Sequence, residues 1–145
     1  MPTTIDSAGI TFNDATSLTS ANIGTAQLVN GSVTASKLGT NEQKQICKAW
    51  VNFNGTTSPG TIRSSYNVSS VTKNGTGDYT VNFTTALADA NYCVTGTTNP
   101  AAGPSNYSIG VKPGVSPTLS AVRLTTGDYN SNQDTSQNSI AIFGN

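Results

Sequence analysis

The stretch Lys73-Asn74-Gly75-Thr76-Gly77-Asp78-Tyr79-Thr80-Val81-Asn82-Phe83-Thr84 decides the fold class. In its second half, Tyr79, Val81 and Phe83 alternate with polar residues, which is the two-residue period of a strand with one buried face. In its first half, Asn74-Gly75 predicts a tight hairpin turn, because this pair accepts the positive φ angles that such turns require. The stretch therefore predicts two antiparallel strands joined by a short turn.

The same kind of pattern extends over the chain from Ala49 onward. Ala49, Val51 and Phe53 share one face of a further alternating segment, and turn residues separate the segments from one another. Regular strands with no helical pattern between them predict an antiparallel β-sandwich over residues 49–145. The strand candidates are Ala49–Asn54, Thr61–Val68, Val71-Thr72, Tyr79–Thr84, Asn91–Thr95, Tyr107–Val111, Leu119–Thr125 and Ser139–Phe143.

The segment before this head has a different pattern. Its apolar residues recur at every fifth position, a step that fits neither a helix nor a strand. One chain could bury only a thin line of these side chains, whereas three copies around a common axis would form a continuous core. We therefore predict a trimeric stalk with a short helical neck over residues 18–48; a regularly spaced flexible linker is the alternative. The predicted axis residues are Leu18, Ile23, Leu28, Val33 and Leu38.

The neck is predicted from a capping pattern. Thr40 is followed three positions later by Gln43, and Lys44-Gln45-Ile46 continues the segment. We expect about two helical turns here.

Composition and charge exclude several classes of function. Only 10% of the residues are charged, and seven basic residues balance seven acidic ones. No basic patch is present, so we expect no nucleic-acid binding. No run reaches the roughly 20 apolar residues that span a bilayer, and we expect no membrane insertion. The N-terminus has no signal-peptide pattern. Low charge with abundant Ser, Thr, Asn and Gly suits an extracellular β-structure. Such a protein without a secretion signal must leave the cell by another route, and release within an assembled virion is one such route.

The chain also offers little chemistry for catalysis or metal binding. It contains two cysteines and no histidine, so we expect no zinc site, no Ser-His or Cys-His dyad and no cofactor. Cys47 and Cys93 are expected to be free thiols, with Cys93 as a small core residue. Asp78 and Asp89 are expected to shape turns, while Asp128 and Asp134 flank an Asn-rich loop. We predict that the protein is not an enzyme.

Several motifs resemble tail-fibre proteins of phages that infect cyanobacteria and other aquatic bacteria. Gly9-Ile10-Thr11-Phe12-Asn13-Asp14 is similar to openings common in such fibres, and residues 30–38 resemble their stalk repeats. Residues 49–55, 62–71, 75–83 and 90–92 are similar in order and spacing to a tip domain of such fibres. The resemblance covers most of the chain up to about Val94. It implies a homotrimeric virion protein that docks on the tail and meets the host.

This resemblance assigns a role to each end of the chain. Residues 1–17 lack the five-residue step and carry Ile5, Ile10 and Phe12 among polar neighbours, so we expect them to attach to tail or baseplate proteins. The head is expected to bind a glycan or protein on the host surface. A purely architectural baseplate or capsid appendage is the alternative, and a polysaccharide depolymerase tip is a weaker one.

Loops on the rigid head are the expected recognition surface. Three are rich in turn residues: 54–60, 97–107 and 126–137. The last combines an aromatic ring with amides and carboxylates, which is the mixture that a sugar requires. The predicted receptor-binding residues are Asp128, Tyr129, Asn130, Asn132 and Tyr107. Trp50 lies out of phase with Val51 and Phe53, and we expect it to pack against a neighbouring subunit or the neck.

Overall fold

The structure is a computed structural model and describes residues 4–6, 9–11, 17–18, 31, 33–100 and 106–144. The chain divides into two compact units, Met1–Gly39 and Thr40–Asn145. In the first unit, a small antiparallel sheet has the order β1-β2-β3, and a 3-10 turn, η2, follows. The elements of this unit are β1 (Thr4–Asp6), β2 (Gly9–Thr11), β3 (Ser17–Leu18) and η2 (Ala35–Lys37).

The predicted stalk and tail-attachment residues fall in this first unit. Ile5 lies opposite Ile10 in the β1–β2 pair, and Ile10 lies opposite Leu18 in the β2–β3 pair. Val33 is 54% exposed and Leu38 is partly exposed. The remaining predicted positions, Phe12, Ile23 and Leu28, lie outside the described residues. The trimeric stalk and the tail attachment stay predictions.

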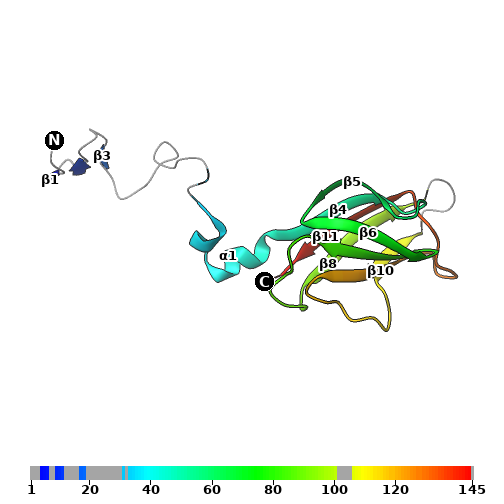
Figure 1. The fold of residues 1–145 in the computed structure, drawn as a ribbon. Coiled ribbons are helices and arrows are strands. Elements are labelled where there is room, and N and C mark those ends of the chain that lie inside the picture. Colours follow the sequence, from blue (N-terminus) through cyan, green and yellow to red (C-terminus); the bar gives the residue numbers. More distant parts are fainter. Residues whose placement is uncertain are drawn as a thin grey trace. The chain divides into compact units, whose positions relative to one another are not determined.

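The second unit is a sandwich of two four-stranded antiparallel sheets, entered through the short helix α1 (Thr40–Gln45) (Figure 1). The β4 sheet has the order β5-β4-β11-β8, and the β7 sheet has the order β6-β7-β10-β9. The first comprises β5 (Thr61–Tyr66), β4 (Cys47–Asn54), β11 (Gln137–Phe143) and β8 (Cys93–Asn99). The second comprises β6 (Val68–Gly75), β7 (Asp78–Phe83), β10 (Ala121–Gly127) and β9 (Ser108–Val111).

The sequence prediction of a mainly β, antiparallel head is confirmed, but several strand boundaries differ, among them β8, which continues to Asn99 where the predicted strand ended at Thr95. Two of the differences have a clear cause. The predicted strand Thr61–Val68 ends at Tyr66, because Asn67 takes a φ of 54° and turns the chain into β6 in the other sheet. The hairpin between β6 and β7 turns at Thr76-Gly77, where Gly77 has a φ of 60°, and not at Asn74-Gly75. In both places the strand pairing decided which residue carries the positive φ.

Alternating side chains of both sheets fill the core. On β4 and β7 these are the residues that the sequence pattern indicated, and Phe53 and Tyr79 meet edge to face with ring centroids 5.3 Å apart. The buried apolar residues are Ala49, Val51, Phe53, Val68, Val71, Tyr79, Val81, Phe83, Leu87, Tyr92, Val122, Leu124, Ile140 and Ile142.

The two cysteines do not pair, as expected. Cys47 and Cys93 lie opposite Phe143 from either side of β11, on β4 and β8. Two strand spacings of about 4.8 Å separate their Cα atoms, which is beyond the reach of a disulfide. The expectation that Cys93 is a core residue was wrong, because this side chain is exposed at the edge strand.

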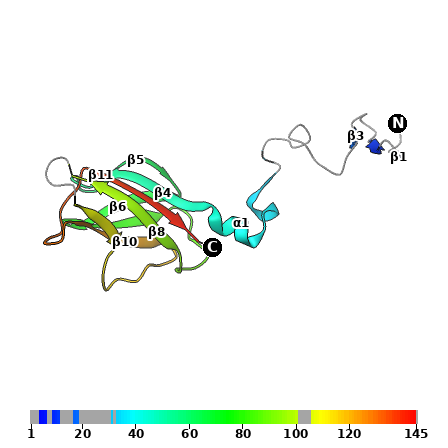
Figure 2. The ribbon, with the colours of Figure 1, turned by 180° about the vertical axis from the view of Figure 1, so that it is seen from behind.

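The sandwich has two distinct ends. β4 begins at Cys47 and β11 ends opposite it at Phe143, next to α1; we call this the proximal end. The connections β4–β5, β6–β7 and β10–β11 lie at the opposite, distal end (Figures 1 and 2). The hydrogen bond from the Gly55 N–H to the Thr135 carbonyl, 2.9 Å, joins two of these connections.

Candidate functional site

The longest distal connection holds four of the five predicted receptor-binding residues. It links β10 to β11 through residues 128–136, and we call it the distal loop. Its tip residue Tyr129 is 97% exposed. A large aromatic side chain in water on all sides contributes nothing to the core and is available for contact with another molecule.

Asp128 gives the tip its shape. Its Oδ1 accepts hydrogen bonds from the Asn130 and Ser131 N–H groups, both at 2.9 Å, and its own N–H donates to the Ser131 carbonyl at 3.2 Å. This is the local turn that aspartate forms with the backbone that follows it. Asp128 therefore positions Tyr129 and Asn130, with its carboxylate occupied inside the loop.

Hydrogen bonds join the second half of the distal loop to β10. The Gln133 N–H donates to the Thr126 carbonyl at 2.9 Å, and the Thr126 hydroxyl donates back to the Gln133 carbonyl at 2.6 Å. Asn132 accepts a hydrogen bond from the Thr125 hydroxyl at 3.0 Å. These hydrogen bonds hold the distal loop in a fixed conformation at the end of β10.

Tyr107, the fifth predicted residue, reaches the same loop from the chain before β9. Its hydroxyl donates to Gln133 Oε1 at 2.7 Å. Beside it, a hollow of about 180 Å³ lies between β9 and the end of β10 and is bordered by Asp128 and Asn132. The structure therefore brings all five predicted residues to one region of the distal end.

Asp134 anchors the loop to the core, a role that the sequence did not indicate. Its Oδ2 lies 2.6 Å from Lys73 Nζ, and its Oδ1 accepts from the Gly77 N–H at 2.9 Å and the Tyr79 hydroxyl at 2.8 Å. Burial opposes ionisation, but these donors outweigh it and lower the pKa of Asp134. The loop is joined to two strands of the β7 sheet through one ionised carboxylate.

Asp78 forms a second ion-pair cluster and not simply a turn, as we had expected. Arg123 binds it with two parallel hydrogen bonds of 2.8 and 2.9 Å, and Lys112 Nζ lies 3.0 Å away. The hydrogen bond from Arg123 is the main reason that the pKa of Asp78 falls from 3.8 to about 2; burial opposes this shift and Lys112 adds to it.

The low pKa of Asp78 makes stability depend on pH. The stabilisation is fully present above the unfolded-state pKa and is lost as the pH falls through the folded-state value of about 2. Between pH 4 and pH 2 we therefore expect a loss of roughly 2 kcal/mol of unfolding free energy from this group. Denaturant titrations across this range measure it. In Asp78→Asn the acid-dependent loss should be smaller; an unchanged pH profile would contradict the assignment.

No protein-family model, curated protein or solved structure matches this chain. The site must therefore be judged on its geometry. Among the described residues, no group of three metal-ligating side chains occurs, and no helix is long and apolar enough to cross a membrane.

The sequence did not indicate the exposed pair of Trp50 and Tyr66, and the expected packing of Trp50 against a neighbouring subunit or the neck stays a prediction. Trp50 is 38% exposed on the outer side of the β4 sheet and lies opposite Tyr66, which is 58% exposed. In the alternating pattern of this strand, Trp50 is out of step with Val51 and Phe53, which indicated that its side chain faces away from the core. Its pairing with Tyr66 depends on a register that includes a β-bulge, and the sequence gives no signal for it.

Proposed function

We propose that this chain is a homotrimeric tail-fibre protein of a phage, in which the distal end of the head adsorbs to the host surface. The observation that carries the proposal is the distal loop, a rigidly held connection whose tip exposes Tyr129 almost completely at the end opposite α1. Because the N-terminal segment enters the head at α1, a head attached through that segment has its distal end free for contact.

The fibre proposal also has support from the sequence. The five-residue apolar step over residues 18–38 suits a trimer, and the motifs of residues 9–14 and 49–92 resemble tail fibres. Virion localisation and attachment through residues 1–17 belong to the same proposal. Three heads on one stalk would give avidity, so that three weak contacts hold a cell firmly.

A depolymerase tip is less well supported. Glycoside hydrolysis usually requires one protonated and one ionised carboxyl at a defined separation. In the candidate pair Asp128 and Asp134, the Asp128 carboxylate is engaged by backbone N–H groups of its own loop, and Asp134 has a lowered pKa and is bound to Lys73, which suits neither to act as the acid. Release of reducing sugar from host polysaccharide by the purified protein would contradict this conclusion.

Tyr129→Ala should lower adsorption to host cells at least about tenfold, because a central aromatic anchor is lost in each of three heads. The melting temperature should stay nearly unchanged, since the side chain is 97% exposed. Binding of purified protein to host cells measures the effect. Normal adsorption in this variant, and in one with Asp128 and Asn130 also replaced, would place the contact elsewhere.

The trimer is tested separately through the stalk. Native mass spectrometry should give three times the 14.9 kDa mass of the chain. Leu28→Asp should weaken assembly, because three carboxylates would meet in a desolvated axis. A stable monomer of the unaltered protein at micromolar concentration would contradict the stalk prediction.

A further inference from the structure

The outer face of the β4 sheet carries an aromatic pair that the distal-loop proposal does not use. Trp50 on β4 lies directly opposite Tyr66 on β5 on one side and Ala141 on β11 on the other. Directly opposite residues of antiparallel strands point to the same side of a sheet, and both rings are substantially exposed. Two aromatic side chains therefore lie side by side on a solvent-facing sheet.

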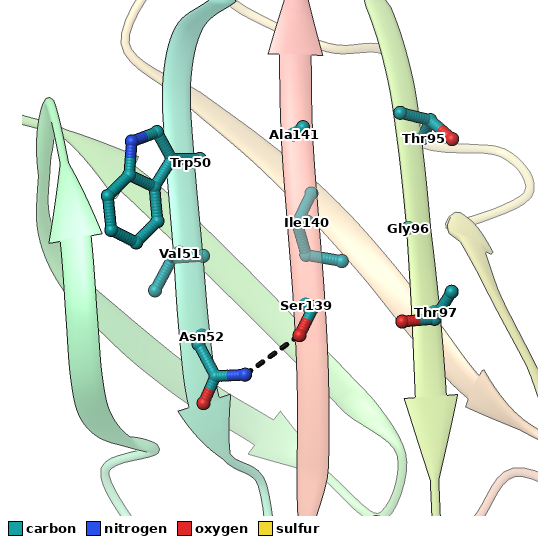
Figure 3. A pocket seen from close by; sticks show the side chains of 9 residues that line it. All are labelled: Trp50, Val51, Asn52, Thr95, Gly96, Thr97, Ser139, Ile140 and Ala141. Atoms are coloured by element: carbon teal, nitrogen blue, oxygen red, sulfur yellow. Dashed lines mark hydrogen bonds between the residues drawn. The ribbon is translucent and has the colours of Figure 1, made fainter.

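A hydrogen-bonded polar group adjoins these rings. Asn52 Nδ2 donates to Ser139 Oγ at 2.7 Å, as Figure 3 shows. Arg63 donates from Nη1 to Asn52 Oδ1 at 3.2 Å and from Nη2 to the Ser136 carbonyl at 2.6 Å. The guanidinium group is thus held in a fixed position on the same face, before any ligand arrives.

Small side chains leave a shallow hollow beside Trp50. Its floor is formed across β11 and β8 by Ser139, Ala141, Thr95 and Thr97, and its volume is about 440 Å³ (Figure 3). The Trp50 ring lies on the β5 side of β4 and leaves this floor uncovered. A ring of the size of a monosaccharide fits such a space, with hydroxyls on one side and an indole on the other.

The charged residues on the strands of this face are all basic. The strands β5, β4, β11 and β8 contain Lys48 and Arg63 and no aspartate or glutamate. The acceptors of Arg63, the Asn52 amide and the Ser136 carbonyl, are neutral, and the ion pairs within the described residues do not include Arg63. In contrast, Lys73 and Arg123 of the β7 sheet are each neutralised by an aspartate. The β4 sheet therefore offers a cationic surface.

We propose that this face is a binding site for a saccharide that carries carboxylate groups. An aromatic ring packs against the C–H face of a sugar, the Asn52, Ser139 and Thr97 groups suit its hydroxyls, and the Arg63 guanidinium binds a carboxylate. The site is separate from the distal loop and does not require that the chain belong to a virion.

The test is calorimetric titration of the full chain with an oligogalacturonate, using its methyl ester as the uncharged control. We expect binding of the acid form, weakening as salt is added, and much weaker binding of the ester. Trp50→Ala and Arg63→Gln should each weaken binding about tenfold. Matched controls are Leu119→Ala, a 47% exposed apolar residue outside the β4 sheet, and Lys44→Gln, an exposed cation on α1.

Three results would overturn the proposal. One is equal affinity for the acid and the ester, which would remove the role of Arg63. Another is unchanged affinity in both Trp50→Ala and Arg63→Gln. The third is a change of oligomeric state in Trp50→Ala without a change in saccharide binding, which would make the face a contact between copies of the chain. Host adsorption is not part of this test, so its result is independent of the fibre proposal.

Discussion

Replacing Phe53 with alanine should lower the free energy of unfolding by about 3–5 kcal/mol, because a fully buried ring is removed from the centre of the sandwich. Phe53 has no exposed surface and packs edge to face on Tyr79, with ring centroids 5.3 Å apart. Its loss leaves a cavity between the two sheets that rigid strands close only in part. Chemical denaturation of the full chain at a fixed protein concentration measures the change.

Trp50→Ala is the matched control for this experiment. Trp50 is larger than Phe53 and lies three positions earlier on the same strand, but it is on the outer face and 38% exposed. We expect a cost of about 1 kcal/mol or less, since surface substitutions rarely cost more. Equal effects of the two substitutions would contradict the assignment of inner and outer faces of β4.

Asp134→Ala should cost about 2–4 kcal/mol, because three donors lose an ionised acceptor. These donors are Lys73 Nζ, the Gly77 N–H and the Tyr79 hydroxyl. Burial raises the pKa of Tyr79, so its hydroxyl stays protonated and donates at neutral pH. Asp134→Asn keeps an oxygen acceptor and loses the charge, so its cost should be intermediate.

Asp128→Ala is the control within the same loop. Its carboxylate bonds mainly to the backbone two and three residues later, so about 1 kcal/mol should be lost. Thermal and denaturant unfolding of both variants measure the difference. If Asp128→Ala were the more destabilising change, Asp134 would not be the residue that anchors the distal loop to the core.

The alternation of apolar residues was enough to predict the strands and the core. Val51, Phe53, Val81 and their neighbours on β4 and β7 are buried as the two-residue period indicated. The loop around Tyr129 was predicted for a similar reason, because its residues favour turns and lie between two strands. These are local properties, and local sequence carries them.

The long-range partnerships could not be predicted in the same way. Asp78 binds Arg123 45 positions later, and Lys73 binds Asp134 61 positions later. The Trp50–Tyr66 pair depends on a bulge between Asn52 and Phe53. The turn at Gly77 is fixed by the register of β6 on β7, where Asn-Gly would have placed it two residues earlier. Each of these features is decided by strand register, which the residues themselves do not reveal.

Immunogold labelling tests most directly the proposal that this chain is a tail fibre. Antibodies raised against the purified protein would be applied to phage particles whose genome encodes the chain and imaged by electron microscopy. The account predicts gold particles at the tail, separated from the tail surface by the length of a stalk. It also predicts that the labelled particles adsorb less to host cells. Gold on the capsid alone, or particles without any gold, would contradict the account.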